Sequence, residues 1–178
     1  MSDILTPFQR HRNMAAIHSS STKPELKLRQ ALWRLGFRYR VNDKRLPGKP
    51  DIVFPMPRTA VFVHGCFWHG HEGCKNYIVP KANTDFWVAK VATNQERDQE
   101  VWRKLEAKGW NVIIVWECQL KKGCIDETVN RVAAEIKKNG EMLRRAKEGR
   151  WKAREEYRQE QKARKEREAA LLEEVKQL

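Results

Sequence analysis

The chain has 178 residues, and its 36 lysines and arginines outnumber 23 aspartates and glutamates to give a formal net charge of +13. This length allows one domain with a sizeable core, plus appendages. So large a charge predicts a polyanionic partner, most simply a nucleic acid, with an acidic protein or a membrane surface as alternatives. Because no window is apolar enough to span a bilayer and the N-terminus lacks a secretory h-region, we expect a cytoplasmic, nucleoid-associated protein.

Composition divides the chain into three predicted parts. Residues 1–22 form a basic N-terminal arm, residues 23–140 a domain, and residues 141–178 a charged extension. Thr22 and Glu25 have the spacing of a capping box, and Pro24 lies in the first turn of the helix that follows. That helix is predicted to bury one apolar stripe and to end at Gly36, the stripe being Leu28, Ala31, Leu32 and Leu35.

Three strands are predicted next. Residues 37–41 alternate as a half-buried strand, residues 42–50 are rich in turn formers, and residues 51–54 and 59–63 form two further strands. If these last two pair as a hairpin, Asp51 lies across from Phe62 and beside the backbone of Val63. The carboxylate is therefore expected beside the segment that starts at residue 64.

The remainder of the domain is predicted to be helix, strand and helix. A helix over 84–108 is expected to break near Thr93 and Asn94. Residues 111–116 are almost continuously apolar, which is typical of a central strand covered on both faces, and a helix over 126–138 completes an α/β domain.

Residues 141–178 contain twelve basic and nine acidic residues with few apolar ones. Several oppositely charged pairs four residues apart support an exposed helix. We interpret this extension as a solvated helix with little effect on chemistry; a DNA-gripping arm and a dimerising helix are the alternatives.

Residues 64–74 place three histidines, two cysteines and two large aromatic side chains within eleven positions. Thiolates and imidazoles at short spacing suit a tetrahedral zinc ion. The predicted ligands are Cys66, His71, Cys74 and Cys118, the last of which follows the strand over 111–116 by two residues. Cys124 is a rival fourth ligand, and buried free cysteines with surface histidines are the alternative to a zinc site.

With that zinc set, His64 and His69 remain free for proton transfer, since an imidazole titrates near neutral pH. Asp51 is the candidate acidic partner. Hydrolysis of a phosphodiester also requires a hard cation, and Mg²⁺ typically takes one or two carboxylates together with waters. Asp51 and a backbone carbonyl across the hairpin would provide such a site. On its own, Asp51 would be only a turn residue at a strand start.

Four blocks of sequence together resemble the Vsr very-short-patch repair endonucleases. They are residues 47–51 (PGKPD), 61–69 (VFVHGCFWH), 94–98 (NQERD) and 115–118 (VWEC), and the resemblance runs from about residue 13 to 118. It implies a restriction-endonuclease-like fold, with a central mixed sheet flanked by helices and a structural zinc. It also implies strand-specific, magnesium-dependent nicking of DNA beside the thymine of a T·G mismatch, the product of 5-methylcytosine deamination.

The resemblance further implies roles for individual residues. Asp51 would bind Mg²⁺ together with the backbone carbonyl of Val63, a position where the family often has a hydroxyl residue. His69 would activate the attacking water and His64 would assist at the phosphate. Glu25 and Asp98 would hold waters in the outer shell of the metal.

Mismatch recognition would rest on apolar side chains. Phe67 and Trp68 match the family's aromatic wedge, and Met14 and Ile17 would push from the opposite groove. Unstacking costs a few kcal/mol per step and least at a weakened pair, so insertion would itself favour mismatches. The alternative is that Phe67 and Trp68 fill a core beneath the zinc loop.

Two other functions compete with this hypothesis. One is a zinc-stabilised DNA-binding module without hydrolytic activity, and the other is a nicking nuclease of the same fold with a different DNA target. The expected partner is double-stranded DNA with a mismatch. A repair polymerase and a ligase would act downstream, with other mismatch-repair proteins as further candidate partners. We expect a monomer, because one T·G site lacks two-fold symmetry.

Overall fold

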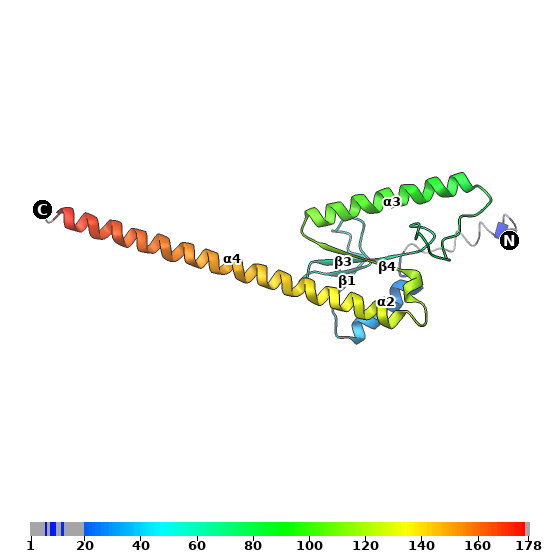
Figure 1. Ribbon diagram of the computed structural model, residues 1–178, viewed down its shortest axis with the longest axis horizontal. Helices are drawn as coiled ribbons and strands as arrows, with labels where there is room; N and C mark the ends of the chain where they lie inside the picture. Colours follow the sequence, from blue (N-terminus) through cyan, green and yellow to red (C-terminus); the bar gives the residue numbers. More distant parts are fainter. Residues whose placement is uncertain (1–5, 7, 10–11, 13–19, 177–178) are drawn as a thin grey trace.

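The computed structural model describes residues 6, 8, 9, 12 and 20–176, with side chains as far as residue 167. Within these residues a four-stranded mixed sheet has the order β1-β2-β3-β4, with strands Arg40–Val41, Ile52–Phe54, Thr59–His64 and Asn111–Trp116. The first two pairings are antiparallel, and β3 pairs with β4 in parallel. Helix α3 (Thr84–Ala107) covers one face, while α2 (Lys23–Arg34) and α4 (Ile125–Lys176) cover the other (Figure 1).

Strands β3 and β4 carry a core on both faces. From β4, Ile113 and Val115 face α2 and α4, whereas Val112 and Ile114 pack on the α3 side. The predicted cover on both faces is thus confirmed, but among the described residues β4 pairs only with β3 and lies at the edge of the sheet, so the prediction of a central strand was wrong. The chain order of helix, strands, helix, strand and helix is confirmed.

The predicted hairpin register is confirmed. Ile52 lies opposite Val61 and Phe54 opposite Thr59, so one further step places Asp51 opposite Phe62. Strand β3 continues to His64, beyond the end of its pairing with β2. On the side of β3 that faces β2, the backbone of Val63 is therefore available to Asp51, while β4 still pairs with Val63 on the other side.

The N-terminal helix is ended by Gly36 as predicted, with a left-handed φ of 86°, but the last residue of the predicted apolar stripe is not buried. Leu28 and Leu32 are fully buried and Ala31 is partly buried, but Leu35 is 53% exposed. The helix ends at Arg34, and the N–H of Phe37 donates to the carbonyl of Leu32 (3.1 Å), which turns the chain. Phe37 then packs against the core where a further turn of helix would have placed Leu35.

The strand predicted over 37–41 is reduced to two residues. Only Arg40 and Val41 pair with β2, and both are exposed. Phe37 and Tyr39 still face inward, with their rings 5.8 Å from that of Phe54. The alternation correctly predicted which side chains face the core, but only two residues pair with β2, so the predicted half-buried strand does not form.

Helix α3 contains no break, contrary to the prediction. It runs from Thr84 to Ala107, and the hydroxyl of Thr93 donates to the carbonyl of Ala89 (2.9 Å) within the helix. The amide of Asn94 donates to the carbonyl of Trp68 (2.9 Å). A tertiary contact thus stabilises a helix that local propensity disfavours.

The two helices predicted over 126–138 and beyond residue 141 are one continuous helix, α4, of 52 residues. Its first part packs against the sheet and α2 through Val129, Val132 and Ile136, and its second part projects far beyond the rest of the molecule (Figure 1). None of the described helices is long and apolar enough to span a membrane.

Candidate active site and metal centre

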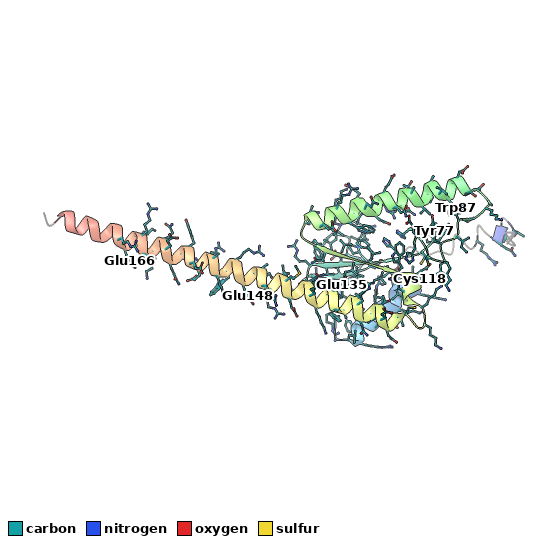
Figure 2. The ribbon with its side chains drawn as sticks, viewed as in Figure 1. Tyr77, Trp87, Cys118, Glu135, Glu148 and Glu166 are labelled. Carbon is teal, nitrogen blue, oxygen red and sulfur yellow. The ribbon has the colours of Figure 1, made fainter. Side chains whose placement is uncertain are left out.

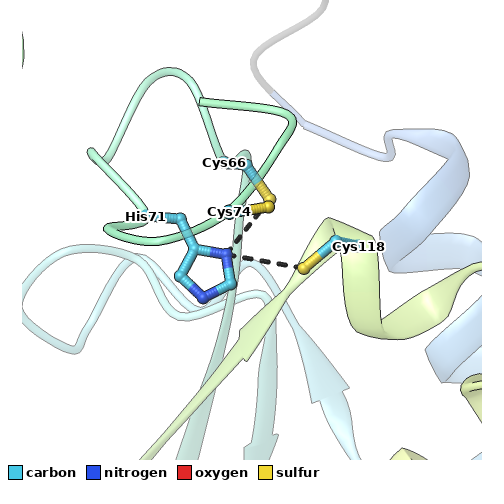
Figure 3. A group of neighbouring side chains, drawn as sticks. All are labelled: Cys66, His71, Cys74 and Cys118. Atoms are coloured by element: carbon cyan, nitrogen blue, oxygen red, sulfur yellow. Dashed lines mark hydrogen bonds between the residues drawn. The ribbon is translucent and has the colours of Figure 1, made fainter. Parts of the chain in front are cut away.

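Three cysteines and one histidine meet where β3 and β4 end, as predicted. The ligand atoms of Cys66, His71, Cys74 and Cys118 lie within 4.8 Å of one another (Figure 3). Nδ1 of His71 is 3.4 Å from the sulfurs of both Cys66 and Cys118. In a tetrahedral zinc site, bonds of about 2.3 Å to sulfur and 2.05 Å to nitrogen separate these atoms by about 3.6 Å. The donor set and its spacing therefore fit zinc.

Backbone contacts and one stacked ring shape this centre. The N–H of His71 donates to the carbonyl of Cys66 (2.9 Å), and the N–H of Cys66 donates to Glu117 (3.1 Å). The imidazole of His71 stacks on Trp116 with a centroid distance of 4.1 Å and an interplanar angle of 1°. Sequence reasoning assigned no role to Trp116 or Glu117, although both fall within the last of the four blocks.

Burial disfavours charge on two of the three thiols. It raises the pKa of Cys66 to about 12 and also raises the pKa of Cys118, whereas the N–H of Asn76 lowers the pKa of Cys74. A bound cation would offset this cost by replacing the protons. Cys124 is exposed and lies outside the described ligand cluster.

Asp51 occupies a distinct position at the same end of the sheet. One of its carboxylate oxygens accepts the N–H of Val63 at 2.7 Å. Burial raises the pKa of Asp51 to about 6, and the nearby carboxylate of Glu25 adds to the effect, against the lowering influence of the Val63 N–H and Arg29. The negative charge of the Asp51 carboxylate is therefore disfavoured in this partly buried position, and a bound cation would stabilise it.

His64, His69 and Asp98 form a second group with ligand atoms within 4.8 Å of one another. Nδ1 of His69 is hydrogen-bonded to the carboxylate of Asp98, and the two imidazoles stack at 3.7 Å. Burial lowers the pKa of His64 to about 3, so this ring is neutral at physiological pH. Burial favours a higher pKa for Asp98, but the hydrogen bond and charge of His69 outweigh it and the pKa falls.

Arg29 links Glu25 to the Asp51 backbone, a connection that the sequence did not reveal. Its buried guanidinium donates to the Glu25 carboxylate (2.8 Å) and to the Asp51 carbonyl (3.0 Å). Glu25 also accepts the backbone N–H groups of Ser21 and Thr22. The predicted capping residue is thus fixed beside the candidate site.

Phe67 and Trp68 lie in a cluster of aromatic rings. Their centroids are 5.2 Å apart, and Trp87 from α3 lies 5.3 Å from Phe67 and 6.0 Å from Trp68. Both predicted wedge residues are half-buried, so they are neither core residues nor freely exposed. Sequence reasoning missed Trp87; the adjacent aromatic pair Phe86-Trp87 at the start of a helix was the available signal. Met14 and Ile17 lie outside the described residues.

Two amides of α3 fasten the loop that carries these rings. Asn94 donates to the carbonyl of Trp68 (2.9 Å), and Gln95 donates to the carbonyl of His69 (3.3 Å). The third of the four blocks, residues 94–98, thereby fixes the loop to α3, and its Asp98 binds His69. Sequence reasoning assigned a role only to Asp98.

A basic chain with an acidic residue, paired histidines and a thiolate-rich cluster at one sheet end has the features of a metal-dependent nuclease. Comparison with known proteins supports this class. The family described as DNA mismatch endonuclease Vsr matches residues 2–76. The chain is 51% identical over 138 residues to the type II nicking enzyme V.NmeAIP of Neisseria meningitidis, covering 77% of this chain and 98% of that protein.

Two further relatives agree. The type II nicking enzyme V.XorIIP of Xanthomonas oryzae is 47% identical, with 67% of this chain and 88% of the relative covered. The DNA mismatch endonuclease Vsr of Escherichia coli K12 is 42% identical, with 68% of this chain and 77% of the relative covered. The chain belongs to the Vsr family of DNA mismatch endonucleases, and it is a DNA endonuclease.

Proposed function

We propose that this endonuclease hydrolyses the phosphodiester next to the thymine of a T·G mismatch, on that strand only, in very-short-patch repair of deaminated 5-methylcytosine. The observation that carries the proposal is the meeting of Asp51, the His69–Asp98 pair and the aromatic cluster at one end of the sheet. A repair polymerase and a ligase would complete the repair after the nick.

Asp51 and the carbonyl of Val63 hold the catalytic Mg²⁺ in this proposal. The N–H and C=O of one strand residue point to the same side, so the carbonyl of Val63 faces the side of β3 where its N–H meets Asp51. Among the described residues, only one Asp51 oxygen accepts a hydrogen bond, which leaves the other for a cation. When bound, Mg²⁺ offsets the charge that develops on the phosphate.

The histidines carry the proton chemistry. Because Nδ1 of His69 is hydrogen-bonded to Asp98, Nε2 is left to accept a proton from the attacking water. Asp98 both orients the ring and stabilises its protonated form. His64 is held neutral by burial and acts as a hydrogen-bond partner of the phosphate. Glu25 and Asp98 also position water around the site.

Zinc at Cys66, His71, Cys74 and Cys118 has a structural role. It would join the loop after β3 to the 3-10 helix η1 (Glu117–Leu120), and it would leave no open position for substrate. The same loop carries His69 and the aromatic rings. The metal therefore fixes the catalytic base relative to the recognition element.

Phe67 and Trp68 act as a wedge between bases beside the mismatch, with Trp87 supporting both rings. Insertion is cheapest where pairing is already weak, so the wedge discriminates against matched duplex. Met14 and Ile17 would enter from the other groove. Membership of an endonuclease family argues against a non-catalytic binding module, and a nicking enzyme with another target remains the competing proposal.

The substrate is tested with end-labelled duplexes that differ only at one pair: T·G, each of the other mismatches, and the matched pairs. Each is placed in a methylated-cytosine context and in an unrelated flanking sequence, with the two strands labelled separately. We expect one nick, on the T strand of the T·G duplex. Equal cutting of several mismatches would assign the enzyme to the competing class.

A further inference from the structure

The projecting part of α4 has no role in the proposed mechanism. Figure 2 shows Cys118 in the globular part of the molecule, Glu135 within the packed part of α4, and Glu148 and Glu166 progressively farther out along the projecting helix. The match to the Neisseria relative covers 138 of the 178 residues. Residues 144–154 are all exposed. Packing against the core therefore does not explain their side chains.

Because α4 is continuous, each residue advances by about 100° around one axis. Seven exposed basic residues between residues 141 and 167 then fall within a sector of about 120°. They follow one another at helical spacing, and we call them the basic stripe: Arg144, Lys147, Arg150, Arg154, Arg158, Lys162 and Lys165.

The glutamates between residues 141 and 167 occupy the other side of the helix. They fall within a second sector of about 140° that contains no member of the basic stripe, namely Glu141, Glu148, Glu155, Glu156, Glu160 and Glu166. Ion pairs of Glu155 with Arg158 (3.6 Å) and of Lys162 with Glu166 (3.8 Å) lie at the boundary between the sectors. Arg145, Lys152 and Arg167 share this second sector, so its charge is mixed, whereas the sector of the basic stripe contains no glutamate between residues 141 and 167.

An exposed indole lies inside the basic stripe. Trp151 falls between Arg144 and Arg158 around the axis and is 66% exposed. An indole combines a large apolar surface with a polar N–H, which suits contact with a ligand that also binds the neighbouring basic residues. Met142 and Tyr157 are also exposed but fall in other sectors, so no apolar seam for a second helix forms in the described segment.

We propose that the basic stripe binds the phosphate backbone of double-stranded DNA, independently of sequence. The stripe spans 21 residue steps, or about 32 Å, which is comparable to nine or ten base pairs. Charge complementarity and the DNA substrate of the family favour DNA over an acidic protein. The proposal rests on endonuclease activity alone and not on T·G specificity.

The stripe contacts a duplex segment other than the one at the mismatch. The projecting helix leaves the core at the end remote from Cys118 and the candidate site (Figure 2). DNA held at the site therefore reaches the stripe only by flanking sequence that passes along α4, or through a second duplex. Such a contact would retain the enzyme on DNA while it searches for mismatches.

The test compares two triple variants of the full-length protein with the same change in charge. The stripe variant is Arg150→Gln, Arg154→Gln and Lys165→Gln. The control variant removes two arginines and one lysine from the opposite side: Arg145→Gln, Lys152→Gln and Arg167→Gln. Binding to a mismatch-free duplex of about 60 base pairs is measured by fluorescence anisotropy between about 50 and 200 mM salt, together with nicking at saturating enzyme.

Each lost phosphate contact lowers the slope of log affinity against log salt by about 0.9. Loss of three contacts lowers this slope by about 2.7. The fourfold increase in salt therefore weakens DNA binding by the stripe variant about 40-fold less than binding by the wild type. We expect this from the stripe variant but not the control, with nicking unchanged. The same measurement on a duplex of about 14 base pairs locates the contact. If the two variants have the same slope on this short duplex, the stripe binds DNA that flanks the site. If the stripe variant loses as much slope as on the long duplex, the stripe binds any duplex.

Equal slopes for the two variants would overturn the proposal, because net charge alone would then explain binding. A stripe variant indistinguishable from the wild type would do so as well. Sedimentation provides a further test: if the stripe variant changes the oligomeric state, the basic stripe instead meets the acidic face of a second copy.

Discussion

Asp51→Asn is expected to make the protein more stable and inactive. Asparagine keeps the acceptor that binds the N–H of Val63 but carries no charge. Burial, with Glu25 nearby, raises the pKa of Asp51 from 3.8 to about 6 in the folded protein. The folded state therefore disfavours the carboxylate form of Asp51, the form to which we assign Mg²⁺ binding.

The sign follows from linkage. A carboxyl group with a raised pKa contributes fully to stability below pH 3.8, and this contribution is lost as the pH rises through about 6. A difference of about two pH units corresponds to about 3 kcal/mol, and partial exposure reduces it to about 1 to 3 kcal/mol. Since about 1 kcal/mol shifts the melting temperature of a protein of this size by about 2 to 4 °C, the gain is measurable.

The assay is thermal unfolding of wild type and Asp51→Asn from about pH 4.5 to 8, in magnesium-free buffer without chelator so that bound zinc is retained. The variant should melt above the wild type by the smallest margin at the acidic end, and this margin should grow about threefold to several degrees at pH 8. Asp43→Asn is a control of opposite sign, because the hydrogen bond from Arg45 lowers the pKa of Asp43 to about 2. A gain for Asp51→Asn that does not depend on pH would refute the reasoning.

Three further outcomes are expected. Cys118→Ser should remove one zinc per chain and lower the melting temperature, whereas Cys124→Ser should retain the metal, as measured by mass spectrometry of the purified protein. Trp87→Ala should lower the preference for mismatched over matched duplex by about 5-fold or more in binding assays, since Trp87 packs on both wedge rings and each aromatic pair contributes about 0.5 to 1.5 kcal/mol. Leu32→Ala should cost about 2 to 5 kcal/mol in urea unfolding and Leu35→Ala less than about 0.5 kcal/mol; equal losses would contradict the observed helix end.

Short-range patterns in the sequence predicted which candidate site residues lie close together. The four predicted zinc ligands lie together because three share one short loop and Cys118 follows the strand that pairs with β3. Asp51 meets Val63 because the hairpin register of two adjacent strands follows from their alternation. The order of the elements and the apolar cover on both faces of β4 were predictable for the same reason, but its place at the edge of the sheet was not.

The remaining features depend on contacts between distant segments. Arg29 reaches the Asp51 backbone only after α2 docks on the sheet, and the aromatic ring of Trp87 reaches Phe67 across the loop. The continuity of α3 depends on Asn94 bonding to Trp68, which local helix propensity does not encode. Leu35 was wrongly predicted to be buried, because the helical spacing was continued one residue beyond Arg34, where the helix ends.

Strand-resolved nicking of a T·G duplex, with and without Mg²⁺, tests the central claim most directly when wild type is compared with Asp51→Asn and His69→Ala. We predict one Mg²⁺-dependent nick on the T strand, abolished by Asp51→Asn and reduced by about 100-fold or more by His69→Ala, with mismatch binding retained by both variants. Wild-type nicking rates in either variant would contradict the assignment of the active site to this end of the sheet.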